Sequence, residues 1–350
     1  MASSRGEGIY MDLINRLVRN LAGWGRRRLI YAALSVVALV FFATIPLWLD
    51  VDESYFGYYF FIVCIYVICA QAWNLLAGYT GQISLAGNAF FGLGAFTMAL
   101  LWWYDVTKTM YYFDPLLMFL AGVAPVILAI IIGIPLLSRL RGDYFSFGTL
   151  GVALMIEALF LNGGSFTRGA EGIYLESSRF VSLTNYYWLA LGLAAAATLA
   201  VYLLVNGRIG LALKAIREDE VSAASHGINV LKYKLIAFMI SAFMAGVAGS
   251  VFGYYKFHVE PDGFFNLNWL FYPILMVVLG GTGTIFGPWI GAFFVGALFA
   301  YGDIYFGGYH PVFSGVLIIL VMLFMPAGIV GLGEKLSFGR VRSFLVRRTE

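Results

Sequence analysis

Residues Gly207–Asn229 read GRIGLALKAIREDEVSAASHGIN, a charged and helix-prone stretch between two long apolar segments. Elsewhere the chain largely avoids charge: 61% of its 350 residues are hydrophobic and 12% are charged, whereas a soluble domain carries roughly 25% charged residues. Backbone polar groups in lipid must be satisfied inside helices. The composition therefore predicts an all-α polytopic membrane protein that has gathered its polar chemistry into one loop, and we expect that loop to contact a soluble partner.

The apolar segments set the number of membrane spans. A spanning helix needs roughly 20 apolar residues, and one membrane domain over residues 29–333 accommodates ten such segments. A basic segment, 1–28, precedes this domain, and a basic tail, 334–350, follows it. The predicted spans are 29–49, 57–77, 81–103, 116–137, 144–162, 185–206, 231–256, 269–284, 285–303 and 311–333.

The basic residues predict the orientation. If the N-terminus is cytoplasmic, ten spans place 18 of the 22 Lys and Arg residues on the inside, as the positive-inside rule requires. Both termini and the 207–229 loop are then cytoplasmic. The basic residues of segment 1–28 precede a full-length span, so we interpret this segment as a topology anchor and not as a cleaved signal.

Several classes of chemistry lack support in the sequence. Cys64 and Cys69 lie five residues apart and face different directions on a helix, so we expect both to be free. The three histidines are scattered, which predicts no metal site. The chain contains neither a Gly-x-x-x-x-Gly-Lys-Ser/Thr phosphate loop nor a constellation of catalytic groups. We therefore predict that the chain is not an enzyme and that any ATP is bound by another polypeptide.

A polar, glycine-rich stretch interrupts the third span. Gly78–Gly94 reads GYTGQISLAGNAFFGLG and contains five glycines, each of which weakens a helix by roughly 1 kcal/mol relative to alanine. A broken helix there would free backbone groups to bind a zwitterionic or amide-bearing solute. The alternative is glycine-mediated packing with hydrogen bonds between helices. The polar residues of this predicted pathway are Thr80, Gln82, Ser84 and Asn88.

Three further features concern packing and charge within the membrane. Small residues recur every four positions in the seventh span, which indicates helix packing or, alternatively, a pathway lining: Ser241, Ala245, Gly249 and Gly253. Glycines at 280, 281 and 283 predict a tight inner turn before the ninth span. Glu157 is the clear carboxylate within a span. It could contact a solute ammonium, carry a proton or extend to the outer surface.

The charged loop has the pattern of a docking helix over Leu211–Ala224. Its apolar residues fall on one face at helical spacing: Leu213, Ile216, Val221 and Ala224. Arg217 could pair with Glu220 on that face, and Lys214 with Glu218. Gly227 predicts the end of the helix. Such a face suits a groove on a soluble protein, although an ordinary surface connector would show a similar charge run.

At these residues the sequence resembles the branched-chain amino acid permeases of ABC transporters, of the LivM type. The ending MPAGIVGLGEK is also similar, and together the matching blocks cover most of residues 70–335. The blocks that carry the resemblance are Asn74–Gly94 (NLLAGYTGQISLAGNAFFGLG), Arg141–Gly151 (RGDYFSFGTLG), Gly207–Gly249 and Gly280–Ala292 (GGTGTIFGPWIGA).

The resemblance implies a permease of the bacterial cytoplasmic membrane, paired with a second, related permease. Two ATPase subunits that bind ATP and magnesium would lie at the cytoplasmic face, and a periplasmic binding protein would deliver the solute. The 207–229 loop would be the coupling helix. Its coupling residues would be Arg217, Glu218, Asp219, Glu220, Ala224 and Gly227.

Three positions depart from the family pattern. Asn88 stands where a Ser-Leu-Gly-His block commonly ends, and the acidic residue expected soon after Thr149-Leu150-Gly151 comes later, as Glu157. The outer loop reads Thr167–Ile173 without the usual Gly-Gly-Pro. These changes leave urea, short amides and other amino acids open as substrates. The rival hypotheses are an ion-coupled secondary transporter that uses Glu157, a membrane enzyme and a non-transporting scaffold.

Overall fold

The computed structural model describes residues 42–46, 52, 54–106, 113–176 and 181–306, with scattered positions between 312 and 330. The chain forms two compact units, Met1–Asp50 and Val51–Glu350. Residues 42–46 of the first unit are helical, and the fold below is that of the second. Most of the first and tenth predicted spans, 29–49 and 311–333, and both termini lie outside the described residues.

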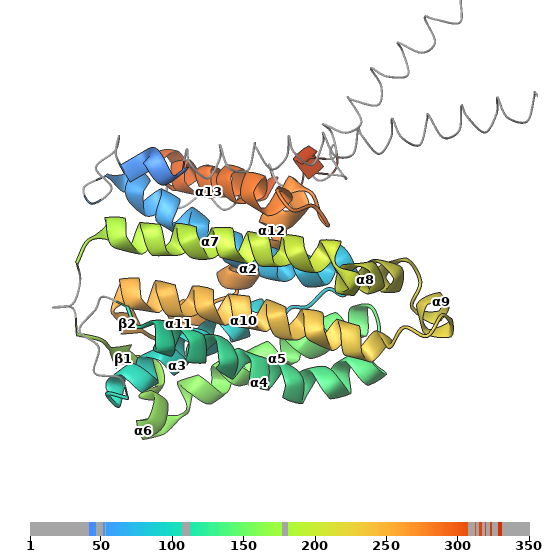
Figure 1. Cartoon of the computed structure of the whole chain (residues 1–350). Helices are drawn as coiled ribbons and strands as arrows, with labels where there is room; N and C mark the ends of the chain where they lie inside the picture. Colours follow the sequence, from blue (N-terminus) through green and yellow to red (C-terminus); the bar gives the residue numbers. More distant parts are fainter. Residues whose placement is uncertain are drawn as a thin grey trace, which may run out of the picture. The chain divides into compact units, whose positions relative to one another are not determined.

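Within the described residues, each of the other eight predicted spans corresponds to a helix (Figure 1). Six stretches are long and apolar enough to cross a membrane: α2, α4, α5, α7, α10 and Pro261–Gly280, which joins α11 to α12. This confirms the all-α polytopic membrane class. The helices are α2 (Tyr55–Thr80), α3 (Gly87–Trp103), α4 (Pro115–Arg139), α5 (Asp143–Leu161), α7 (Leu183–Asn206), α10 (Val230–Lys256), α11 (Pro261–Phe264), α12 (Asn268–Gly280) and α13 (Gly287–Phe306).

Two helix boundaries differ from the prediction. The third span was expected from residue 81, but α2 continues to Thr80 and α3 begins only at Gly87. The eighth and ninth spans, expected to meet at residues 284 and 285, are separated by a non-helical turn over residues 281–286. This confirms the tight turn predicted from the glycines at 280, 281 and 283, although the eighth helix ends four residues before the predicted boundary. Both differences fall in glycine-rich sequence, where helix propensity is low.

Helix α10 packs against α2, α3 and α4 (Figure 1). Its small residues let neighbouring backbones approach closely, because a Cβ atom added at Gly249 would lie 2.0 Å from the carbonyl oxygen of Phe91 on α3. Gly253 also faces α3, near Met98. Close backbone approach of this kind gains van der Waals contact where the hydrophobic effect is absent.

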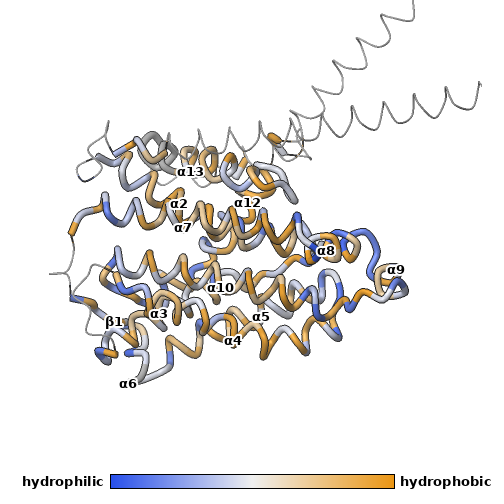
Figure 2. The backbone as a smooth tube through the Cα atoms, viewed as in Figure 1, coloured by the Kyte–Doolittle hydropathy of each residue, from blue (hydrophilic) through white to orange (hydrophobic). Residues whose placement is uncertain are grey.

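Short elements lie beyond each end of α10, a helix about 40 Å long at 1.5 Å per residue. Before its N-terminus are α8 (Arg208–Glu218) and α9 (Glu220–Ser225). After its C-terminus, β2 (His258–Val259) pairs antiparallel with β1 (Ile173–Tyr174), near α6 (Gly164–Thr167) and the 3₁₀ turn η1 (Gly169–Glu171). The strand pair was not predicted. Figure 2 shows hydrophilic residues gathered around α8 and the turn to α9, at the N-terminal end of α10.

Candidate functional site at the break between α2 and α3

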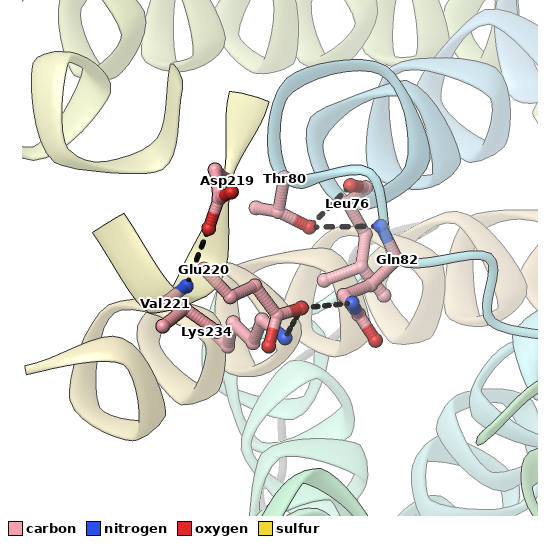
Figure 3. Close-up of polar contacts among 7 residues, drawn as sticks. All are labelled: Leu76, Thr80, Gln82, Asp219, Glu220, Val221 and Lys234. Atoms are coloured by element: carbon pink, nitrogen blue, oxygen red, sulfur yellow. Dashed lines mark hydrogen bonds and ion pairs between the residues drawn. The ribbon is translucent and has the colours of Figure 1, made fainter. Parts of the chain in front are cut away.

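The glycine-rich stretch interrupts helical structure over residues 81–86. Gly81 adopts the left-handed conformation (φ 73°), which ends α2 at Thr80 at little steric cost. The Thr80 hydroxyl donates to the Leu76 carbonyl (2.5 Å) and accepts the Gln82 N–H (3.3 Å). One side chain therefore contacts backbone groups in the last turn of α2 and in the break (Figure 3).

The charged loop is two helices and not one. Asp219 has extended backbone angles (φ −158°, ψ 116°) between α8 and α9. Its carboxylate accepts the N–H groups of Val221 (2.7 Å) and Ser222 (2.9 Å). This is the geometry of an N-cap. The single helix expected over Leu211–Ala224 is therefore wrong, because Asp219 competes for the backbone groups that would continue it. Gly227 has φ 84°, just after α9 ends, as predicted.

This break changes which residues the loop exposes. Leu213 and Ile216, predicted to form a docking face with Val221, are 0% and 1% exposed and pack inward. The exposed apolar side chains are Leu211 (67%) and Val221 (69%), and Ala224 on α9 is also exposed. The two helices of the loop therefore differ: α8 packs against the bundle through Leu213 and Ile216, and α9 exposes Val221 and Ala224 to solvent.

Glu220, the first residue of α9, joins the loop to the break. Its Oε1 accepts a hydrogen bond from Gln82 Nε2 (3.1 Å) and forms an ion pair with Lys234 Nζ on α10 (Figure 3). Lys234 is 2% exposed and Gln82 5%, whereas the Glu220 side chain is 27% exposed. A buried ammonium is tolerated only when paired. Glu220 therefore neutralises Lys234 and holds Gln82 with the same oxygen.

Arg217 ties the end of α8 to the other side of the same break. Its guanidinium donates to the carbonyl of Gly78 in the last turn of α2. The predicted pairs therefore do not form: Arg217 binds α2 and Glu220 binds Lys234, and no ion pair joins Lys214 to Glu218 within the described part of the chain.

The 281–286 turn meets α2 beside this contact. Asn74 Nδ2 donates to the Thr284 carbonyl (2.8 Å), and Asn74 Oδ1 accepts the Gly283 N–H (2.8 Å). Gly283 lies beside the Arg217 guanidinium as well. Three segments far apart in sequence thus meet at one end of the bundle: the end of α2, the charged loop and the turn before α13.

The predicted pathway residues are not brought together. Thr80 and Gln82 lie at the loop junction. Asn88 Nδ2 donates to the Phe265 carbonyl (2.7 Å), and its Oδ1 is buried without a partner among the described residues. Glu157 lies on α5, which contacts α11. That location is towards the β1–β2 end, away from Gln82.

Ser84 borders a small pocket between α2, α3, α10 and α12. Most of its wall is apolar, including Trp73, Phe90 and Trp269, and Ser84 and Ser241 contribute hydroxyl groups. Ala245 lines it as well, so the predicted packing stripe is divided: Gly249 and Gly253 face α3, while Ser241 and Ala245 border the pocket. An apolar cavity with two hydroxyls can hold a small, weakly polar group.

Lys234 and Asn74 were not singled out from the sequence. A signal for Lys234 existed, because it lies inside the predicted span 231–256, where a charge needs a partner. Asn74 lies in the last two turns of α2, next to the predicted span boundary at residue 77, and its role depends on a turn 209 residues away. No local pattern reveals such a contact.

Comparison with known proteins adds independent findings. Residues 55–325 match the family described as branched-chain amino acid transport system, permease component. The chain is 31% identical over 299 residues to the LivM permease protein of the high-affinity branched-chain amino acid transport system of Salmonella typhimurium, covering 76% of this chain and 68% of the relative. It is also 37% identical over 128 residues to the LivH permease protein of Escherichia coli, covering 36% and 41% of the two chains. No solved structure matches the chain.

Proposed function

Because the chain belongs to the family of branched-chain amino acid transport permeases, we propose that it is the membrane-spanning permease subunit of an ATP-driven importer of the ABC class. Its substrates are branched-chain or related amino acids or small amides. The observation that carries the proposal is the family match, which extends across α2 to α13 and includes the charged loop. This chain would form part of the path for the substrate across the membrane, and separate ATPase subunits would supply the free energy of ATP hydrolysis.

The geometry of the loop supports its role as the coupling element. Helix α9 exposes Val221 and Ala224, and Glu218 at the end of α8 is exposed as well, so apolar and acidic groups face the same solvent region. Docking of an ATPase on this surface would push on α9. Glu220 and Arg217 connect the loop to α10 and α2, so that such a push reaches the membrane domain.

The proposed assembly has four kinds of partner. A second homologous permease completes the path, consistent with similarity to both LivM and LivH relatives. Two ATPases bind ATP and magnesium, a solute-binding protein delivers substrate, and lipid surrounds the whole. The chain itself holds no cofactor. We place it in the bacterial cytoplasmic membrane with ten spans, both termini and the 207–229 loop on the cytoplasmic side.

Co-purification and reconstitution test this function. The tagged chain, extracted in mild detergent, should bring with it two nucleotide-binding subunits and a related permease. In liposomes that complex should accumulate leucine, isoleucine or valine only when the binding protein and ATP are present. Glu218→Ala and Gly227→Leu should impair assembly or substrate-stimulated ATPase activity, while Glu157→Gln should leave ATP dependence intact.

An opposite outcome would support the rival transporter. If the chain purifies alone and moves solute in liposomes without ATP, and if Glu157→Gln abolishes that flux together with its dependence on a proton gradient, the importer proposal is wrong. Glu157 would then be the coupling carboxylate.

A further inference from the structure

The segment between α2 and α3 is held by side chains from other elements. Residues 81–86 are not helical, so their backbone groups need partners elsewhere. The Ser146 hydroxyl on α5 donates to the Ile83 carbonyl (2.7 Å), and Thr149 Oγ1 on α5 accepts the Leu85 N–H (2.9 Å). The segment therefore links α5 to α2 through discrete polar contacts, which can rearrange one at a time.

Gln82 connects this segment to the charged loop by one hydrogen bond. Its Nε2 donates to Glu220, 138 residues away in sequence, while its Oε1 has no partner in the described part of the chain. The NH2 group of a glutamine carries two N–H donors, so a small rotation of the amide can keep Nε2 hydrogen-bonded to Glu220. Gln82 is thus able to follow Glu220 when α9 changes position.

Helix α9 is a short unit of its own. The extended backbone at Asp219 separates it from α8, and its N-terminus is capped by Asp219 itself. Glu220 directly follows this break, so a displacement of α9 acts first on the Glu220 carboxylate. Lys234 on α10 resists that displacement through the ion pair.

We propose that Gln82 and Lys234 are positioning residues that, through Glu220, convert movement of α9 into rearrangement of residues 81–86. The ion pair with Lys234 sets the resting position of the Glu220 side chain. The hydrogen bond to Gln82 transmits a displacement of Glu220 to residues 81–86. This inference rests on the proposed function and deepens it by naming the contact through which the coupling loop acts on the membrane domain.

The mechanical link is tested on the complete chain in lipid nanodiscs by hydrogen exchange. Gln82→Leu should increase amide exchange in α9, and Glu220→Gln should increase it in residues 81–86. Both changes should be roughly tenfold or more, since a hydrogen bond to a charged group contributes about 1.5–3 kcal/mol. Ile83→Ala and Ser225→Ala are matched controls on the same two elements, because the Ile83 side chain is exposed and the Ser225 hydroxyl donates within α9, to the Ser222 carbonyl. Exchange that changes only in the mutated element would overturn the proposal.

The transport role is tested in the reconstituted complex. Gln82→Leu retains the Glu220–Lys234 ion pair, so assembly and basal ATPase activity should persist while uptake per ATP hydrolysed falls roughly tenfold. A charge swap, Glu220→Lys with Lys234→Glu, should restore uptake when Gln82 is present, since the introduced ammonium can donate to the uncommitted Gln82 Oε1. The same swap combined with Gln82→Leu should stay uncoupled.

These outcomes separate the inference from the proposed function. If the wild-type complex shows no ATP-dependent uptake, the proposed function fails, and the exchange experiment still decides the link between α9 and residues 81–86. If uptake is ATP-driven but Gln82→Leu leaves the ratio of uptake to hydrolysis unchanged, Gln82 transmits nothing. If the swap restores coupling even with Gln82→Leu, the ion pair alone suffices and the role assigned to Gln82 is wrong.

Discussion

The two members of the buried ion pair should differ in their contribution to stability. Glu220→Gln leaves the ammonium of Lys234, which is 2% exposed, without a counter-charge. Breaking a buried pair in this way costs roughly 3–5 kcal/mol, and the proximity of water through the 27% exposed Glu220 side chain favours the lower end. Lys234→Met instead leaves a carboxylate that reaches solvent and still accepts the Gln82 hydrogen bond. Its cost should be about 1 kcal/mol, within the range of one lost hydrogen bond.

The double variant Glu220→Gln/Lys234→Met provides the control. With both charges removed, an apolar side chain fills the buried position and stability should return to within about 1 kcal/mol of wild type. The purified full chain is denatured in detergent and followed by tryptophan fluorescence, or by the fraction that stays monodisperse after heating. Wild type, Lys234→Met and the double variant should lie within about 1 kcal/mol of one another, and Glu220→Gln should be clearly the least stable. Equal losses in the two single variants, or a double variant as unstable as Glu220→Gln, would refute the reasoning.

Three further predictions concern other parts of the bundle. Gly249→Ala should destabilise the chain by about 1–3 kcal/mol, since the added methyl group would overlap the α3 backbone. Gly192 on α7 faces open space, so Gly192→Ala should be neutral or stabilising in the same thermal assay. Asn74→Ala should cost about 2–3 kcal/mol because two backbone groups of the 281–286 turn lose their partner, whereas Asn206→Ala, at an exposed helix end, should cost little. The hydrogen bond from the Ser182 hydroxyl lowers the pKa of Asp52; burial opposes it, and hydrogen bonds from Leu183 and Thr184 add to the lowering. The resulting stabilisation is complete above the ordinary pKa of 3.8 and is lost as the pH falls through the lowered pKa, so the melting temperatures of wild type and Asp52→Asn should converge as the pH is lowered below 3.8.

The sequence predicted the helices well because the membrane constrains them strongly. Apolar runs of about 20 residues have few alternatives to a spanning helix, and the eight predicted spans within the described residues all proved helical. Gly81 and its neighbours also indicated the interruption after α2. The glycines at 280, 281 and 283 likewise indicated the turn before α13. The exact span boundaries were wrong because composition shows that a helix is weakened but not which residue ends it.

The arrangement of the site depended on contacts that sequence periodicity does not encode. The pattern from Leu213 to Ala224 is helical on average, yet the Asp219 carboxylate captures two N–H groups and divides it. Arg217 and Glu220, three residues apart, were expected to pair with each other. Each instead satisfies a distant buried group, the Gly78 carbonyl or the Lys234 ammonium, because an unsatisfied buried group costs more than a solvent-exposed pair gains.

The placement of Gln82 bears on how polar residues in membrane proteins should be interpreted. Thr80, Gln82, Ser84 and Asn88 were predicted to line a solute path because a broken helix at membrane depth frees backbone groups that can bind a solute. Thr80 satisfies the backbone at a helix end, and Gln82 binds the loop that we expect the ATPases to move. These two contacts explain why residues 80 and 82 are polar without requiring a bound solute. Ser84 differs, because it borders a pocket with Ser241 and aromatic walls. The two functions proposed for this stretch, coupling and solute contact, therefore fall on Gln82 and Ser84, two residues apart in one non-helical segment.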